Sequence, residues 1–251
     1  MTTDGPVALV TGGAGGIGRA IASRMAADGR TVVVADLDAD AVRETAAAVP
    51  GPAHGVILDV ADADSRRAVI ATCDDLGGID TLVNCAGVLR DARLAKLDPA
   101  AFRRLQDVNL LGPLALTRLA AVGMTRRGRG AVVNLASRAW LGTFGSTAYS
   151  TAKGGLVGAT RSLALELGPH GITVNALAPG FVDTAMTDGL PPEIRRRTLG
   201  AIPVGRAGRP EDVADAVVFL TGATYVTGQV LPVCGGRSVA DPYAARPRPR
   251  S

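Results

Sequence analysis

The sequence predicts a single α/β domain with a doubly wound, mostly seven-stranded parallel sheet and helices on both faces. Three observations lead to this fold class. Short apolar runs alternate with stretches of helical periodicity along the 251 residues. The apolar runs are continuous, which is typical of strands buried on both faces of a parallel sheet. A glycine-rich turn joins the first strand to the first helix, as in Rossmann-type folds.

The elements can be assigned in chain order. The first helix has Ile17, Ile21 and Met25 on one face and ends at Gly29. Further helices are expected at residues 40–49, 62–76, 99–124 (one or two helices), 146–167 and 210–220. The expected strands cover residues 7–10, 31–35, 55–58, 79–83, 131–135, 172–177 and 229–233. Right-handed crossovers place the helices on both faces of the sheet.

No linker or repeat divides the chain. Residues 1–240 are expected to form one domain, in which residues 183–209 make a weakly ordered lid rich in proline and glycine. Residues 241–251 are rich in proline and arginine, and we expect this tail to be disordered.

Composition excludes several function classes. The net charge of +4 is divided among separate arginine clusters and aromatic residues make up 3%, so no nucleic-acid partner is expected. The three cysteines form no disulfide framework or metal-ligand spacing, which favours a reducing, cytoplasmic compartment and no metal. Neither a signal peptide nor a membrane-spanning apolar run is expected.

The loop between the first strand and the first helix is a candidate phosphate site. Its glycines, Gly12, Gly16 and Gly18, allow close backbone approach to a pyrophosphate, and the helix N-terminus offers unpaired N–H groups. A tight turn without a ligand is the alternative interpretation.

Asp36 ends the second expected strand, 18 residues after Gly18. A carboxylate there accepts hydrogen bonds from ribose hydroxyls and repels a 2′-phosphate, and the following Leu37 supplies no cation. We therefore expect NAD, with NADP less favoured; a helix N-cap is the alternative role. Later strand ends supply further candidates beside the adenosine, or ordinary turn residues: Asp59, Val60, Asn84, Ala86 and Gly87.

Four residues form a candidate proton-transfer site. Tyr149 and Lys153 are four residues apart on one helix face, where the ammonium is expected to lower the phenol pKa. Ser137 closes the fifth strand and can donate to a carbonyl oxygen, and Asn109 lies in the preceding helix.

Taken together, these motifs resemble the short-chain dehydrogenase/reductase family over roughly residues 5–236. The resemblance is carried by Thr11-Gly-x-x-x-Gly16-Ile17-Gly18, Asn84-x-Ala86-Gly87, Asn109, Ser137, Tyr149-x-x-x-Lys153 and Pro179-Gly180. It implies that Tyr149 is the acid/base, that Lys153 holds the nicotinamide ribose, that Ser137 orients the carbonyl and that Asn109 supports a water-linked relay. It further implies a phosphate loop that includes Ile17, a carboxamide contact from Val182 and Thr184, and a homotetramer or homodimer.

Two departures from the family pattern stand out. Ser137 precedes Tyr149 by 12 residues where many members have 13, and Cys234 replaces a common Asp near the C-terminal strand. Cys234 lies in the C-terminal region, which in this family is often an oligomer contact. Candidate substrate contacts are Leu89, Ser137, Trp140 and Tyr149, although Trp140 can equally be a packed loop anchor.

The leading hypothesis is an NAD(H)-dependent oxidoreductase that interconverts a secondary alcohol and a ketone by hydride transfer. The first alternative is an NADPH-dependent 3-oxoacyl-carrier-protein reductase, which the stretch around Ile202-Pro203-x-Gly205-Arg206 resembles but which Asp36 and Leu165 disfavour. The second is a non-catalytic dinucleotide-binding sensor or assembly subunit.

Overall fold

The computed structural model describes residues 5–240, apart from the side chains of Met186 and Asp188. Seven parallel strands form one sheet in the order β3-β2-β1-β4-β5-β6-β7, which confirms the predicted fold class. The direction of winding reverses between β1 and β4. The strands are β1 (Val7–Thr11), β2 (Thr31–Asp36), β3 (Ala53–Ile57), β4 (Ile79–Asn84), β5 (Gly130–Leu135), β6 (Ile172–Pro179) and β7 (Val230–Val233).

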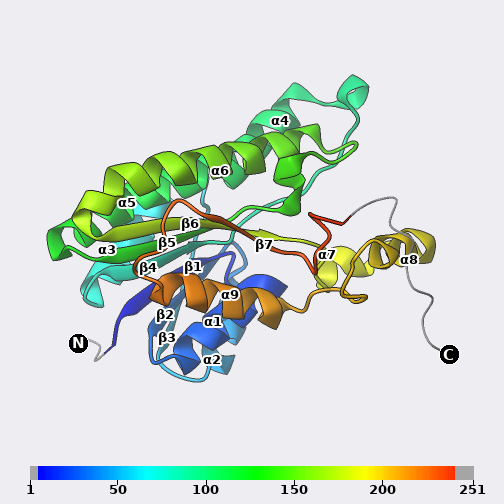
Figure 1. The fold of residues 1–251 in the computed structure, drawn as a ribbon. Coiled ribbons are helices and arrows are strands. Elements are labelled where there is room, and N and C mark those ends of the chain that lie inside the picture. Colours follow the sequence, from blue (N-terminus) through cyan, green and yellow to red (C-terminus); the bar gives the residue numbers. More distant parts are fainter. Residues whose placement is uncertain (1–4, 241–251) are drawn as a thin grey trace.

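Helices cover both faces of the sheet (Figure 1). One layer contains α1 (Gly16–Ala27), α2 (Ala39–Ala48) and α9 (Pro210–Gly222). The other contains α3 (Ala63–Asp75), α4 (Pro99–Gln106), α5 (Gly112–Arg127) and α6 (Thr147–Leu167). Two short helices, α7 (Ala185–Asp188) and α8 (Pro192–Gly200), lie beyond the carboxyl ends of the strands.

The strand residues explain why both faces are covered. In β1, Val7 and Leu9 pack into the core under α3 and α5, whereas Ala8 and Val10 pack into the core under α1 and α9. Successive side chains of a strand point to opposite faces of the sheet. Because helices cover both faces, all four side chains are buried. A strand that is apolar at every position is therefore stable only between two helical layers.

Several boundaries differ from the sequence-based expectation. The stretch predicted as one or two helices at 99–124 consists of α4 and α5 joined by a π-helical turn, Asp107–Leu111. The lid segment contains α7 and α8, so it is more regular than expected. The predicted tail, 241–251, lies outside the described residues.

The stretch Pro99–Arg127 is long and apolar enough to pass a composition test for a membrane span. No run of this kind was expected from the sequence. Leu116, Ala120 and Met124 of α5 nevertheless lie in the core against the sheet, so the apolar character of this helix is used in packing.

A chain of buried polar side chains runs across strands β4 and β5 on the face that α5 and α6 cover. The Asn84 amide donates to Asn134 Oδ1 (2.8 Å) and Thr117 Oγ1 (3.2 Å), and the Asn134 amide donates to Thr160 Oγ1 (2.9 Å). The Thr160 hydroxyl donates in turn to the Leu156 carbonyl. These side chains are fully buried, so each bond satisfies a group that water cannot reach.

Replacing Thr160 by Val keeps the shape but leaves the buried Asn134 amide without this acceptor. We expect the free energy of unfolding to fall by about 1–3 kcal/mol in a urea titration. Thr151→Val is the matched control, because its hydroxyl donates to a carbonyl four residues earlier in the same helix but is exposed. Equal losses in both variants would contradict the role of the network.

Candidate active site

The glycine loop between β1 and α1 lies at the point where the sheet reverses its winding, the position at which such sheets bind ligands. Gly12 has a φ of +63°, and a Cβ there would lie 2.8 Å from Cα of Ala86. A Cβ on Gly18 would lie 2.0 Å from the Gly12 carbonyl oxygen. Glycine is therefore required because three backbone segments meet here.

The N-terminus of α1 has the properties of an anion site. Its N-cap is Gly15, which makes no side-chain capping bond, and its first turn contains no acidic residue. By contrast, the carboxylates of Asp38 and Asp62 cap α2 and α3. The first N–H groups of α1 thus lack a side-chain acceptor, which fits a bound pyrophosphate.

Thr11 joins the two strands that flank this crevice. Its Oγ1 accepts hydrogen bonds from the backbone N–H groups of Cys85 (3.1 Å) and Ala86 (3.0 Å). Sequence reasoning quoted Thr11 as part of a motif but did not assign this role. The only signal was a hydroxyl at the end of an apolar strand.

Asp36 lies beside the glycine loop. One carboxylate oxygen accepts from the Ala14 N–H (3.1 Å) and the other from the Leu37 N–H (2.8 Å). The N-cap role considered for Asp36 belongs instead to Asp38, whose carboxylate accepts from Asp40 and Ala41. Asp36 therefore orients the loop, and each oxygen keeps lone-pair capacity for ribose hydroxyls.

The other predicted adenosine-side residues have different surroundings. Val60 is buried, and Asp59 accepts from the Ala61 N–H at 2.8 Å. The Asn84 side chain points into the buried polar chain, where its Oδ1 has no partner among the described residues. A nucleotide contact at this turn would therefore come from the backbone and from the Ala86–Gly87 segment.

The catalytic candidates converge at the carboxyl ends of β4 and β5. Lys153 is 3% exposed, and its Nζ donates to the Leu135 carbonyl at 2.7 Å. That Nζ lies 5.6 Å from the centre of the Tyr149 ring, and the Ser137 hydroxyl is hydrogen-bonded to the Tyr149 phenol. The short interval between Ser137 and Tyr149 therefore still allows the two hydroxyls to meet.

Asn109 lies in the π-helical turn between α4 and α5. Its amide donates to the carbonyls of Val88 (3.0 Å) and Leu105 (3.1 Å), and its Oδ1 accepts from the Val88 N–H. A Cβ on Gly87 would lie 2.7 Å from Oδ1 of Asn109 and 3.6 Å from Nζ of Lys153. The absence of a side chain at Gly87 thus lets Asn109 and Lys153 approach the same turn.

The pKa of Tyr149 corrects one expectation. Burial raises the pKa of its phenol above the usual value, the hydrogen bond with Ser137 opposes this, and the nearby Cys85 and Asp91 raise it further. The sequence had predicted that the Lys153 ammonium lowers the pKa of the Tyr149 phenol. Burial lowers the pKa of Lys153 itself to about 8, with an opposing contribution from Cys85. At neutral pH the phenol is therefore protonated.

The lid meets the glycine loop through Thr184. A Cβ on Gly16 would lie 3.2 Å from the Thr184 methyl group, so the two segments are in contact distance. Val182 is buried and pairs with Gly208, which holds the start of the lid against its end. Both predicted carboxamide contacts thus lie close to the nucleotide crevice.

The C-terminal end of β6 packs against the end of β7. A Cβ on Gly180, which follows Pro179, would lie 2.7 Å from Cβ of Cys234. The Cys234 thiol lies 3.2 Å from the Ser238 hydroxyl, so the unusual cysteine is accommodated within a local turn.

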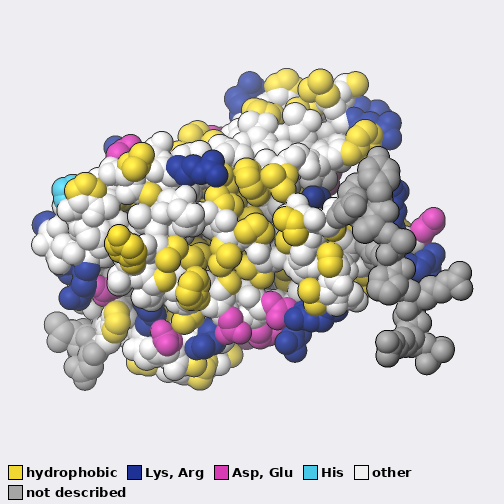
Figure 2. Space-filling model, viewed as in Figure 1, with side chains coloured by type: hydrophobic (Ala, Val, Ile, Leu, Met, Phe, Trp, Pro, Cys, Tyr) yellow, Lys and Arg dark blue, Asp and Glu magenta, His cyan; other side chains and the backbone are white. Residues whose placement is uncertain are grey.

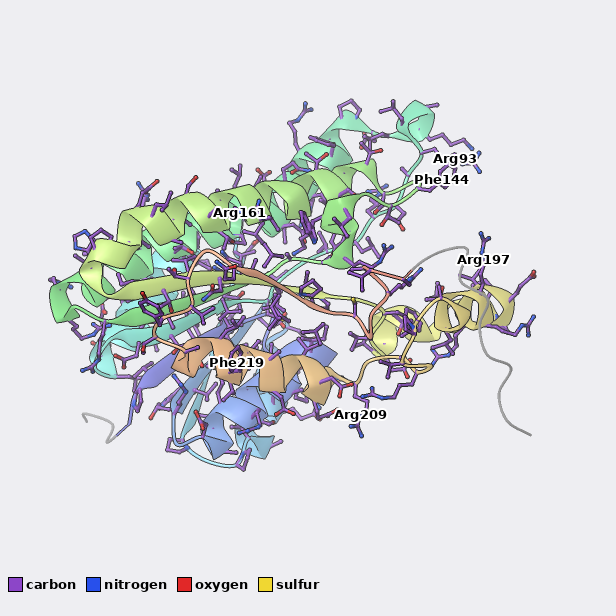
Figure 3. All side chains as sticks on the ribbon, in the orientation of Figure 1. Arg93, Phe144, Arg161, Arg197, Arg209 and Phe219 are labelled. Carbon is purple, nitrogen blue, oxygen red and sulfur yellow. The ribbon has the colours of Figure 1, made fainter. Side chains whose placement is uncertain are left out.

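Two of the predicted substrate contacts, Trp140 and Leu89, have different surroundings. Trp140 packs against a small cluster that includes Ala136 and Val230, which favours the loop-anchor interpretation. Leu89 is exposed within the loop that follows β4. Figure 3 shows Arg93 and Phe144 at the same end of the molecule, with the Arg93 guanidinium 5.3 Å from the Phe144 ring centre.

Within residues 5–240, no group of three or more metal-ligating side chains is found.

Comparison with known proteins decides the family. The family model described as enoyl-(acyl carrier protein) reductase matches residues 12–238. The chain belongs to the short-chain dehydrogenase/reductase family. This family binds nicotinamide dinucleotides and catalyses oxidoreduction.

Several relatives match almost the whole chain. The (2S)-[(R)-hydroxy(phenyl)methyl]succinyl-CoA dehydrogenase subunit of Thauera aromatica is 45% identical over 93% of this chain and 96% of its own. The 3-oxoacyl-[acyl-carrier-protein] reductase of Thermotoga maritima is 38% identical over 94% and 99%. The structure of a candidate gluconate dehydrogenase from Agrobacterium tumefaciens superposes with a TM-score of 0.91 at 33% identity, covering 95% and 98%.

The burial of Lys153 has a consequence for stability. Between pH 8 and about 10.5, the unfolded chain binds a proton that the folded chain does not, so this group makes unfolding harder as pH rises. Below pH 8 the folded protein holds a buried charge. We expect Lys153→Met to raise the free energy of unfolding at pH 7 by about 1–2 kcal/mol, measured by urea titration.

Lys96→Met is the control for this comparison, because Lys96 is exposed and is the only other lysine in the chain. Its unfolding free energy should change by less than about 0.5 kcal/mol. A loss of stability in Lys153→Met at pH 7 would show that the charge is better solvated than its burial indicates.

Proposed function

We propose that this protein is an NAD(H)-dependent oxidoreductase that interconverts a secondary alcohol and a ketone, with an acyl thioester as the substrate class. The observation that carries the proposal is the meeting of Ser137, Tyr149, Lys153 and Asn109 at one edge of the sheet. The thioester is suggested by the relatives, whose names describe a CoA-thioester dehydrogenase subunit and an acyl-carrier-protein reductase.

The bound nicotinamide supplies or accepts the hydride, and the protein handles the proton. In the reductive direction, the protonated Tyr149 phenol donates its proton to the substrate oxygen, and the Ser137 hydroxyl orients that oxygen by a hydrogen bond. The raised pKa of Tyr149 suits this direction, because the acid form predominates at neutral pH. Oxidation requires the phenolate and is therefore favoured at higher pH.

Lys153 and Asn109 support this transfer. The Lys153 ammonium uses one donor on the Leu135 carbonyl, and its remaining donors suit ribose hydroxyls and the Tyr149 oxygen. Asn109 holds the turn at Val88 by paired hydrogen bonds and faces Lys153 across Gly87. A water between them would give Lys153 a route for proton exchange with solvent.

The preference for NAD rests on the surroundings of Asp36. Its carboxylate faces the loop that would hold the adenosine side, and Leu37 beside it is exposed and uncharged. Arg43 in the following helix is paired with Asp40. A 2′-phosphate would therefore meet a negative charge without a dedicated cation.

Location and assembly are part of the same proposal. We propose a cytoplasmic homotetramer or homodimer that binds a small-molecule substrate. Figure 2 shows hydrophobic side chains gathered on the face formed by β7 and α9, where Phe219 and Tyr225 are exposed. A subunit contact at this edge of the sheet would remove them from water.

Reduction of a 3-oxoacyl-carrier protein with NADPH is the second candidate, and the Thermotoga maritima relative favours it about equally. Leu165, where those reductases tend to have a basic residue, is 81% exposed on α6. A non-catalytic assembly subunit is a further alternative, since one relative is itself named as a subunit. The intact site residues argue against loss of catalysis.

Tyr149→Phe removes the proton donor but keeps the ring. We expect turnover of a 3-oxoacyl thioester to fall at least 1,000-fold, on the order of the contribution of a positioned acid, while NADH affinity changes little. Absorbance of NADH at saturating substrate measures the first and fluorescence titration the second. Tyr225→Phe is the control, because it also removes a phenol hydroxyl, lies outside the catalytic residues and keeps the ring that the proposed subunit contact would cover; full activity in Tyr149→Phe would overturn the mechanism.

Asp36→Ala tests the cofactor assignment. We expect NADH to bind about tenfold more weakly and NADPH more tightly, because hydrogen bonds to ribose are lost and repulsion of the 2′-phosphate is removed. Both dissociation constants are measured by fluorescence titration. Asp75→Ala, which removes an exposed carboxylate from the end of α3, is the control for net charge. An unchanged ratio of the two dissociation constants would show that Asp36 does not determine the preference for NAD.

A further inference from the structure

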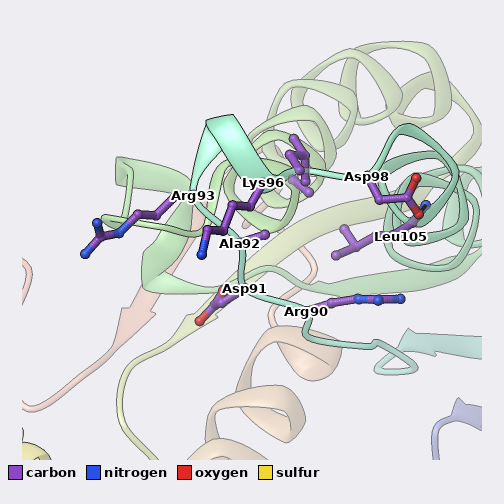
Figure 4. Close-up of a pocket in the computed structure, with 10 residues that line it drawn as sticks. Arg90, Asp91, Ala92, Arg93, Lys96, Asp98 and Leu105 are labelled. Carbon is purple, nitrogen blue, oxygen red and sulfur yellow. Dashed lines mark hydrogen bonds between the residues drawn. The ribbon is translucent and has the colours of Figure 1, made fainter.

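We propose that a cavity beside the catalytic residues holds a phosphate group on the pantetheine arm of the substrate. The cavity has a volume of about 310 Å³ and lies between the loop after β4, helix α4 and the start of α6 (Figure 4). This inference rests on the proposed thioester substrate and names the part of it that this cavity would recognise.

Three basic side chains line this cavity: Arg90, Arg93 and Lys96. Figure 4 shows Arg93 and Lys96 extending to one side of it and Arg90 to the other, so positive charge flanks the space. The stacking of Arg93 on Phe144 restrains one of these groups. Paired arginines and lysines are the side chains that best bind phosphate oxygens.

None of these three cations forms an ion pair or a side-chain hydrogen bond within residues 5–240. Two carboxylates line the same cavity, but both are already engaged. Asp91 accepts from the Ser146 hydroxyl at 2.6 Å, and Asp98 accepts from the Ala100 and Ala101 N–H groups as the N-cap of α4. These uncharged donors leave both carboxylates ionised, so three cations and two carboxylates give the cavity lining a net charge of +1.

The cavity neighbours the catalytic residues, although none of them lines it. Its floor includes Leu105 and Ala148, which belong to the apolar cluster against which the Tyr149 ring packs. Ala92 pairs with Ser146, three residues before Tyr149, and the Asp91 charge acts on the Tyr149 phenol. A ligand anchored in the cavity would therefore have its other end close to the proton donor.

The occupant follows from charge and chemistry. A purely apolar substrate tail would make no use of the three cations, which are exposed and form no ion pair among the described residues. The arm of an acyl thioester ends in phosphate, either within coenzyme A or within the prosthetic group of a carrier protein. The phosphate is common to both sources, so the cavity recognises that group and the experiment separates the sources.

Binding is measured calorimetrically on the intact protein saturated with NADH, using free coenzyme A, 4′-phosphopantetheine and pantetheine as probes. We expect pantetheine to bind at least tenfold more weakly than coenzyme A, because it lacks phosphate. In the variant Arg93→Gln/Lys96→Gln, coenzyme A should lose at least tenfold in affinity and pantetheine should be unchanged. Equal affinity for 4′-phosphopantetheine and coenzyme A supports the pantetheine phosphate as the occupant; much tighter binding of coenzyme A would overturn that assignment in favour of the adenosine phosphates.

The control variant, Arg103→Gln/Arg104→Gln, removes two exposed arginines from α4 that do not line the cavity, so the net charge changes equally. It should bind coenzyme A as the wild type does. Equal binding of coenzyme A and pantetheine, or equal losses in both double variants, would overturn the inference.

A second substrate distinguishes failure of the proposed function from failure of the cavity inference. Acetoacetyl-N-acetylcysteamine, a thioester without phosphate, should be reduced by the wild type and by both double variants at similar rates. If it is reduced but coenzyme A does not bind through the cavity, only the cavity inference fails. If no thioester is reduced while coenzyme A binding still depends on Arg93 and Lys96, the phosphate site stands and the proposed reaction fails.

Discussion

The arrangement of this active site depends on the burial of one ammonium group. Lys153 is held inside the protein by the carbonyl of Leu135; the Tyr149 ring approaches it from one turn earlier in α6, and the Gly87 turn approaches it from the end of β4. A buried charge with few partners is costly, and burial accordingly lowers its pKa to about 8. The proposed function explains why this cost is retained, because it assigns the remaining donors of the ammonium to ribose hydroxyls and the Tyr149 oxygen.

Holding that group requires precise approach of the surrounding backbone. Glycines at positions 12, 18 and 87 remove side chains where β1, α1 and β4 come together, and the Thr11 hydroxyl joins β1 to the turn after β4. Below this edge, Asn84 and Asn134 lock β4 and β5 to their helices by buried hydrogen bonds. The same two strands therefore carry site residues at their carboxyl ends and are anchored to the helices in the core.

The electrostatics of the site differ between its two sides. The nucleotide side has an uncapped helix N-terminus and a single carboxylate at Asp36, which together suit a pyrophosphate and ribose hydroxyls. The proposed substrate side has three cations, Arg90, Arg93 and Lys96, that form no ion pair within residues 5–240. In the proposal made above, the first side attracts the dinucleotide and the second attracts an anionic substrate arm.

The sequence by itself determined the layered fold, because the period of apolar residues is a local property that reports burial on one face or both. It also predicted the glycine loop and the helical spacing of Tyr149 and Lys153. Tertiary structure alone decided which segments meet: that Asp36 contacts Ala14, that the Asn84 side chain turns inward, and that Asn109 lies in a π-helical turn. It also reversed the expected direction of the Tyr149 pKa shift, because the desolvation of a side chain depends on the layers packed around it and not on its neighbours in sequence.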